Sequence, residues 1–143
     1  MALHLIKLCV GCDGIEDLAD WIAVTTAEKR RRGLAPEHVH RTRMSPKRAA
    51  EILDGGSLYW VIKGQIRVRE KILDLRAVTD AAGVPHCDIV LSADLVEVEA
   101  RPYRPFQGWR YLDPAVAPRD LIGEETRDLP IEFLRELAGL GLL

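Results

Sequence analysis

The sequence of 143 residues lacks the features that would assign a function directly. No apolar run approaches the roughly 18 residues that a transmembrane helix needs. Lys7 interrupts the apolar start of the chain, where a signal peptide would require an unbroken run of about 7 to 15 residues. The chain also has no glycine-rich phosphate loop and no G-x-S-x-G nucleophile motif. The sequence therefore does not support a P-loop protein, a dinucleotide-binding protein or a serine hydrolase of the G-x-S-x-G type.

Cysteine is scarce as well. The three cysteines are an odd number in a chain that can fold without disulfides, and this favours a reducing compartment. We therefore expect a cytoplasmic protein that does not contact membranes. In contrast, 48 % of the residues are hydrophobic, and a chain near ~150 residues buries about 70 % of its unfolded surface. We expect a single domain over residues 1–143 with a sizeable core.

Positive charge is concentrated in the middle of the chain, although the net charge is −2. Residues 38–76 contain nine basic and four acidic side chains, and residues 101–119 contain four basic side chains and one acidic. If these stretches fold together, they form a positive face on a mildly acidic protein. The alternative is an ordinary solvated surface on which basic and acidic neighbours are paired.

A core hairpin is expected over residues 55–69. Every residue from 58 to 62 is apolar or aromatic, which is typical of a strand covered on both faces, and Lys63-Gly64 can form a tight turn. Residues 65–77 then alternate as a strand if a bulge near Glu70 restores the register. A helix over residues 65–77 also satisfies the apolar spacing, and the sequence leaves both interpretations open.

The remaining pattern predicts an α+β domain. A capping box of Asp13 and Glu16 starts a helix that ends at Gly33, and Ser45-Pro46 starts a second helix. A third helix is expected after Pro130. Besides the hairpin, strands are expected at residues 3–9, 38–44 (an edge strand), 87–91 and 95–101. Four or five strands with about three flanking helices form a small, largely antiparallel, barrel-like sheet.

Arginines and aromatic residues are interleaved over residues 103–111. Bases stack on aromatic faces and arginines bind phosphates, so this pattern is typical of proteins that bind single strands or flipped bases. The structural alternative is that Phe106 and Trp109 fill the core beneath a rigid proline loop. Trp60 lies within an apolar strand, and we expect it to be a core residue.

Cysteine and histidine form only weak patterns. Cys9 and Cys12 have the spacing of a metal-ligand pair that His86-Cys87 would complete, but structural zinc sites take a second spaced pair and adjacent strand residues point to opposite faces. The same C-x-x-C resembles a redox pair, yet acidic residues follow it and would oppose a thiolate. We expect no metal and no cofactor.

With these residues identified, the chain resembles a family of short bacterial proteins that share an uncharacterised conserved domain. The stretches that carry the resemblance are residues 3–11, 55–64 and 104–112. The chain is also similar, in its order of elements and in residues 59–64, to the PUA and ASCH class of small pseudobarrels. That similarity implies a cleft that binds RNA or modified bases, by fold-level analogy.

Three hypotheses for the function follow. The first is a nonenzymatic domain that binds RNA or a nucleotide-like or modified-base ligand in a basic, aromatic-lined cleft. The second is a small enzyme acting on a nucleotide or another anion, with His38, His40 or Asp88 as acid or base. The third is a protein-interaction module with an apolar patch around Phe106. The binding residues expected under the first hypothesis are Lys63, Arg67, Arg69, Tyr103, Arg104, Trp109 and Arg110.

The first hypothesis makes a geometric prediction. The basic face of the hairpin, formed by Lys63, Arg67 and Arg69, should lie beside residues 104–111. If the two lie on opposite sides of the domain, they cannot form one cleft. The sequence leaves the oligomeric state open.

Overall fold

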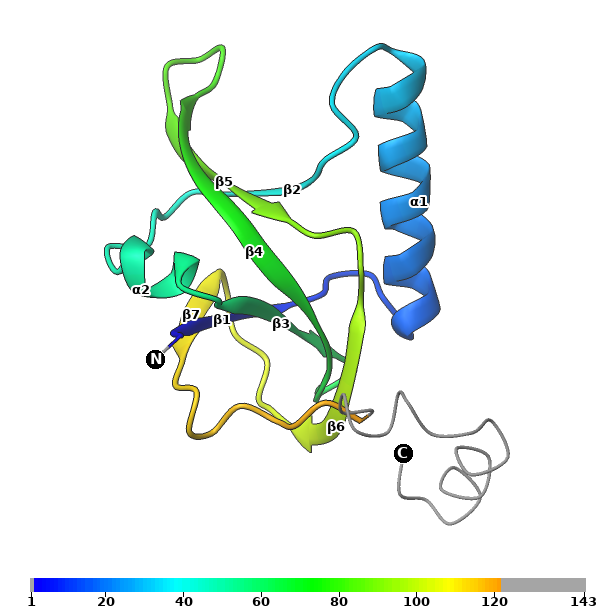
Figure 1. The fold of residues 1–143 in the computed structure, drawn as a ribbon, viewed down its shortest axis with the longest axis vertical. Helices are drawn as coiled ribbons and strands as arrows, with labels where there is room; N and C mark the ends of the chain where they lie inside the picture. Colours follow the sequence, from blue (N-terminus) through cyan, green and yellow to red (C-terminus); the bar gives the residue numbers. More distant parts are fainter. Residues whose placement is uncertain (1, 122–143) are drawn as a thin grey trace.

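The computed structural model describes residues 2–121, which form seven strands and two helices (Figure 1). In chain order they are β1 (His4–Leu8), α1 (Ile15–Arg31), β2 (His38–Thr42), α2 (Ala49–Leu53), β3 (Ser57–Ile62), β4 (Gln65–Thr79), β5 (Pro85–Leu91), β6 (Val96–Pro102) and β7 (Trp109–Leu112). The predicted α+β class is confirmed. The third predicted helix, after Pro130, lies outside the described residues. No helix within residues 2–121 is long and apolar enough to cross a membrane.

The strands pair in the order β2-β5-β4-β3-β1-β7, and β6 pairs with β4. All pairs are antiparallel except β1 and β3, which run parallel, so the sheet is mixed. The pairing path starts at β2 and ends at β7 without joining them, so the predicted barrel is not found and the sheet is open. The chain from β1 to β3 passes through α1, β2 and α2, and this crossover makes the parallel pairing possible.

The hairpin of β3 and β4 is the centre of the fold, as predicted. All six residues of β3 are buried, and the turn places Lys63 at φ 49° and Gly64 at φ 77°, the two positive φ values of a type I′ turn. β4 is a strand, so the helical alternative for residues 65–77 is wrong. Its first half pairs with β3 and β6 and its second half with β5, so this long strand connects two parts of the sheet (Figure 1).

The expected bulge near Glu70 is replaced by two irregularities on either side of it. Arg67 is an extra residue opposite the Trp60–Val61 step of β3, and Leu73 is an extra residue opposite β5. An extra residue in one strand restores the inward side-chain direction after a change of parity. Glu70 itself therefore points into the core and is fully buried, although it lies between two basic residues in the sequence.

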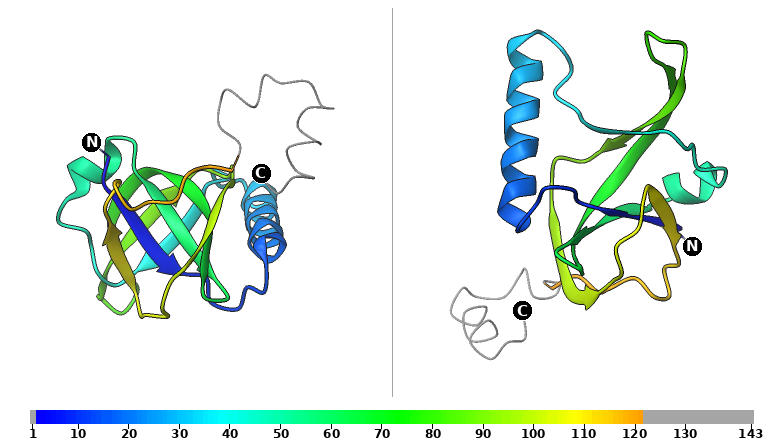
Figure 2. Two further views of the ribbon diagram at one scale, coloured as in Figure 1. Left: turned by 90° about the horizontal axis from the view of Figure 1, so that it is seen from below. Right: turned by 180° about the vertical axis from the view of Figure 1, so that it is seen from behind.

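Two apolar clusters cover the two faces of β1 and β3. One contains Leu5, Leu58 and Trp60 of the two strands. It also contains Leu18 of α1 and further residues of α1, β4 and β5. The other contains residues from β1, β3, β4, β6 and β7: Ile6, Tyr59, Val61, Ile66, Val98 and Leu112. Figure 2 shows α1 standing at the side of the sheet, where its buried residues join the first cluster. The central strands are thus covered on both faces, which explains their nearly continuous apolar sequence.

The helices begin differently from the prediction. Gly14 is the N-cap of α1 and makes no side-chain cap bond, so the capping box of Asp13 and Glu16 is wrong; the Asp13 amide instead donates to Asp17 Oδ2 at 2.7 Å. Gly33, at φ 73°, ends α1 as expected. The start of α2 at Ser45-Pro46 is also wrong, because α2 begins at Ala49.

Two further segments differ in detail. Of the alternating residues Val96, Val98 and Ala100 in β6, only Val98 is buried. β7 was not predicted: it pairs antiparallel with β1, with Trp109 opposite Lys7 and Tyr111 opposite Leu5. The predicted edge strand at residues 38–44 is confirmed as β2, which pairs with β5 alone.

Candidate ligand pocket

A pocket of about 480 Å³ opens where β1 leads into α1. Its walls come from the end of β1, the loop that follows, the first turns of α1, and single residues of β2 and β3. They are formed by Lys7, Leu8, Cys9, Val10, Gly11, Cys12, Asp17, Leu18, Trp21, His40 and Trp60. Lys7, Asp17 and His40 are the polar side chains, and the rest of the wall is apolar, aromatic or sulfur. A few polar groups in a mainly apolar concavity are typical of small-molecule sites.

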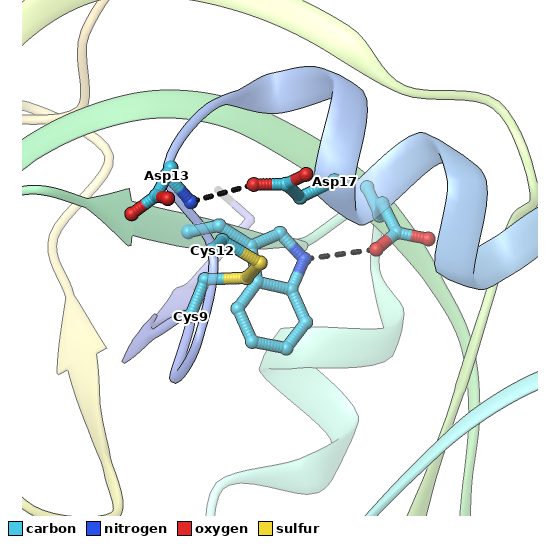
Figure 3. Close-up of a disulfide and its surroundings, with 6 residues drawn as sticks. Cys9, Cys12, Asp13 and Asp17 are labelled. Carbon is cyan, nitrogen blue, oxygen red and sulfur yellow. Dashed lines mark hydrogen bonds between the residues drawn. A yellow bond between two sulfur atoms is a disulfide. The ribbon is translucent and has the colours of Figure 1, made fainter.

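The loop at the base of the pocket is closed by a disulfide between Cys9 and Cys12 (Figure 3). Gly11 has φ 82°, a conformation that glycine adopts without a steric penalty, and this lets four residues turn back on themselves. The loop is also held by the backbone, because the Cys9 amide donates to the Val61 carbonyl at 2.9 Å. Figure 3 shows the disulfide at the start of α1, beside the Asp13–Asp17 hydrogen bond.

His40 supplies a neutral imidazole to this pocket. Burial lowers its pKa to about 4, with smaller contributions from the positive charges of Lys7 and His38. Its Nε2 is buried and has no hydrogen-bond partner within residues 2–121. Lys7 also lines the pocket, and burial lowers the pKa of its ammonium group. The pocket therefore offers one neutral hydrogen-bonding ring and one partly desolvated cation.

Behind the pocket lies a buried polar network centred on Glu70. Its Oε1 accepts from the Trp60 indole at 2.8 Å, and its Oε2 lies 2.7 Å from His38 Nδ1. The other ring nitrogen, His38 Nε2, is buried and has no hydrogen-bond partner among the described residues. The bond from Glu70 fixes the orientation of the Trp60 ring, one wall of the pocket.

Aromatic contacts join this network to the pocket. The rings of His40 and Trp60 meet edge to face with centroids 5.4 Å apart, and those of Trp21 and His38 at 5.1 Å. Trp21 is 46 % exposed, so it is the aromatic wall residue most open to a ligand, whereas Trp60 is buried in the core as predicted. Edge-to-face contacts of this kind hold rings at fixed angles.

The residues predicted to bind nucleic acid are distributed over two faces. Arg69 is committed to a bidentate ion pair with Asp120 (2.8 Å for each bond) and also donates to Ser57 Oγ. Trp109 lies on the same face as Lys7, and its indole donates to the Met44 carbonyl. Arg110, the next residue of β7, lies on the opposite face.

The guanidinium carbon of Arg110 lies 4.7 Å from the centroid of the Phe106 ring, and the Tyr103 ring meets the Phe106 ring edge to face. Phe106 is therefore half-buried under neighbouring side chains and packs against the second apolar cluster, which weakens the idea of an exposed interaction patch there.

Part of the predicted basic face does lie near residue 103. The Tyr103 amide donates to the Gly64 carbonyl, so the start of the arginine-rich and aromatic stretch at residues 103–111 lies beside the hairpin turn. Lys63, in that turn, is 3.4 Å from Asp13, which follows Cys12 of the pocket wall. The side chains of Arg67 and Arg104 make no hydrogen bond or ion pair within residues 2–121. These two cations are the predicted basic residues most available to a ligand, followed by Lys63, whose pair with Asp13 is exposed to solvent.

The candidate acid and base residues do not converge. His38 and His40 share one face of β2, but Asp88 is opposite Arg41 and pairs with it at 2.7 Å on the other face. His86 bonds to Asp80, away from the Cys9–Cys12 loop. Across the described part of the chain, no three His, Cys, Asp or Glu side chains gather as a metal site would require.

The sequence interpretation named His40 only as a candidate acid or base, and it missed Trp21 and Glu70 as site residues. The spacing of His38 and His40 was a usable signal, because alternate residues of a strand share a face. Nothing local identified Glu70 as buried, since its direction depends on the two extra residues in β4.

No curated protein and no solved structure matches this chain significantly. A family model does, over residues 5–143, which is nearly the whole sequence and includes every residue of the pocket. The chain belongs to the family described as "Protein of unknown function (DUF1489)".

Proposed function

We propose that this protein binds a nucleotide-like ligand, with the ring of the ligand in the pocket at the start of α1. The observation that carries the proposal is the size and lining of that pocket. Its volume is about 480 Å³, its wall is mainly apolar and aromatic, and Lys7 and His40 are polar groups in the wall. A pocket of this size accepts a ring system and a short polar substituent.

The polar groups favour a heteroaromatic, anionic ligand. A neutral imidazole both donates and accepts hydrogen bonds, so His40, with its unpartnered Nε2, can bond to the edge of a base. The ammonium group of Lys7 attracts a phosphate or carboxylate, and burial strengthens that attraction. Trp21 offers a ring face on which a base can stack.

The proposal includes RNA as the source of the base. Arg67 and Arg104 are cations available to phosphates on the adjoining surface, and so is Lys63, whose pair with Asp13 is solvent-exposed on both sides and therefore weak. Internal contacts occupy Arg69, Tyr103, Trp109 and Arg110. The sequence predicts that the base of the ligand stacks on Tyr103 or Trp109. In this proposal Trp21 provides the stacking ring instead. The resemblance to PUA and ASCH domains in element order belongs to this proposal as analogy alone, because the sheet is open and no barrel is found.

The test is a binding titration that compares Trp21→Ala with Val24→Ala. Val24 is an exposed apolar residue of the same helix and lies outside the pocket, so it controls for loss of surface apolar area. Nucleosides, nucleoside monophosphates and a short single-stranded RNA are titrated by calorimetry. Removing a stacking ring costs about 1 to 3 kcal/mol, so Trp21→Ala should weaken binding about 5- to 150-fold, and Val24→Ala should leave it unchanged.

The salt dependence separates the two sources of the base. RNA binding through Lys63, Arg67 and Arg104 should weaken steeply between about 50 and 200 mM salt, whereas a mononucleotide should respond much less. Equal affinity of the two variants for every ligand, or no binding by the unaltered protein, would overturn the proposal.

A further inference from the structure

We propose that Cys9–Cys12 is a thiol–disulfide exchange site whose substrate is a low-molecular-weight thiol entering the same pocket. The inference goes beyond the proposed ligand function and does not depend on it. Three observations support it: where the disulfide lies, how little the loop needs it, and which groups surround the sulfurs.

The disulfide forms part of a concave wall, although Cys9 also belongs to the first apolar cluster and Cys12 packs against it. Both cysteines line the pocket, Cys12 is partly exposed, and Cys9 is only 8 % exposed. A thiolate attacks a disulfide along an open approach to one sulfur. Cys12 is therefore the sulfur that an entering thiol reaches first, and Cys9 is the leaving group.

The bond contributes little to holding the fold. It closes a loop between residues only three positions apart, and so short a loop restricts the unfolded chain less than a long one does. The backbone already fixes both ends, through the hydrogen bond from the Cys9 amide to Val61 and the start of α1 just beyond Cys12. A chemical function explains the bond better than a structural one.

The surroundings of the sulfurs favour a leaving thiolate. Lys7 lines the pocket with Cys9, and the N-terminus of α1, a helix of 17 residues, follows Cys12. Both stabilise negative charge on sulfur. The acidic neighbours act in the opposite sense, but Asp17 accepts the Asp13 amide and Asp13 is exposed and paired with Lys63. His40 also lines the pocket, and its buried Nε2, which has no partner among the described residues, can hydrogen-bond to the substrate.

The reaction balances with two thiols as the co-reactant. The first thiolate bonds to Cys12 Sγ, the Cys9–Cys12 bond breaks, and Cys9 leaves as a thiolate. A second thiolate attacks the substrate sulfur of the mixed disulfide, releasing Cys12 as a thiolate and a substrate disulfide. Two electrons pass from the two substrate thiols to the protein disulfide, and the protons lost by the substrate thiols protonate the two cysteines. The reverse sequence reduces a small disulfide.

The experiment equilibrates the full-length folded protein with a series of reduced and oxidised glutathione ratios and traps free thiols by alkylation. Mass spectrometry then counts modified cysteines. We expect Cys9 and Cys12 to change together in one reversible two-electron transition, while Cys87, buried on β5, stays unmodified as an internal control. Cys9→Ser should accumulate one glutathione on Cys12, and Cys12→Ser should accumulate much less on the buried Cys9.

Lys7→Met tests the surroundings. It should slow reduction by glutathione roughly threefold or more, because the leaving thiolate becomes less stable. Thermal unfolding of each variant shows whether it is folded. A disulfide that resists millimolar glutathione in the folded protein for hours, or that exchanges only with a protein dithiol, would overturn the assignment. Nucleotide binding by a Cys9→Ser/Cys12→Ser double variant separates failure of this proposal from failure of the ligand proposal.

Discussion

Glu70 shows how one residue can depend on the whole strand that carries it. Its side chain is fully buried, accepts a hydrogen bond from the Trp60 indole of β3 and shares a second one with His38 Nδ1 of β2. A buried carboxylate without donors is strongly unfavourable, and here both oxygens are satisfied. The network therefore joins the central hairpin to the edge strand that supplies His40 to the pocket.

Removing this carboxylate should destabilise the protein markedly. In Glu70→Ala the Trp60 indole and His38 Nδ1 lose their hydrogen-bond partner in the core, and each unsatisfied buried group costs about 1 to 3 kcal/mol. We expect the free energy of unfolding to fall by about 3 kcal/mol in urea titrations. Glu70→Gln keeps one acceptor oxygen and should lose about 1 kcal/mol.

Glu99→Ala is the matched control, because Glu99 is an exposed residue of β6, and its removal should change stability by less than about 0.5 kcal/mol. Equal losses for Glu70→Ala and Glu99→Ala would show that the buried network contributes nothing to stability.

His40 predicts a dependence of stability on pH. Its pKa is about 4 in the folded protein and near 6.5 in the unfolded chain. Between these values the unfolded chain binds more protons, so stability is complete above about pH 6.5 and is lost as the pH falls towards 4. Because the ring is only partly buried, we expect a loss of about 2 kcal/mol or less.

The measurement compares urea unfolding of the unaltered protein and His40→Gln at several pH values between 4 and 7. His4, whose pKa is lowered by burial and by Arg69, contributes in the same direction in both proteins. The difference between the two curves therefore isolates His40. Parallel curves over this pH range would contradict a depressed pKa for His40.

At the scale of elements, prediction succeeded where local pattern and environment agree. The apolar run of β3 and the Lys63-Gly64 turn specified the central hairpin, and the glycine after α1 specified its end. β7 was missed because its four residues follow a proline loop, and only pairing with β1 makes them a strand. The capping box failed because Gly14 already occupies the N-cap position, one residue after Asp13.

The candidate site was less predictable than the elements. Its residues come from β1, the following loop, α1, β2 and β3, and they meet because β3 pairs in parallel with β1 after a long crossover. Periodicity within one element carries no information about such a pairing. The sequence did identify the C-x-x-C pair and the two histidines, but it gave no reason to place Cys9 and His40 in one wall.

At the scale of the molecule, β1 and β3 lie between two apolar clusters, whereas β2 is at the end of the sheet. Amides in the most enclosed part of a fold exchange only through global unfolding, and edge elements open locally at lower free energy. The pocket is lined by residues from both kinds of strand: Trp60 comes from the central strand β3 and His40 from the edge strand β2.

Native-state hydrogen exchange should therefore show a gradient across the sheet. We expect the slowest exchange at β3 and β1, with protection close to the free energy of global unfolding, and faster exchange at β2. The pattern follows from burial: all six residues of β3 are buried, whereas only His38 of β2 is. Exchange measured by mass spectrometry on peptides from the two strands, with urea added to detect global opening, tests it. Because β2 carries His40, a ligand in the pocket should slow exchange in β2 more than in β3; equal protection of the two strands in the free protein would contradict the gradient.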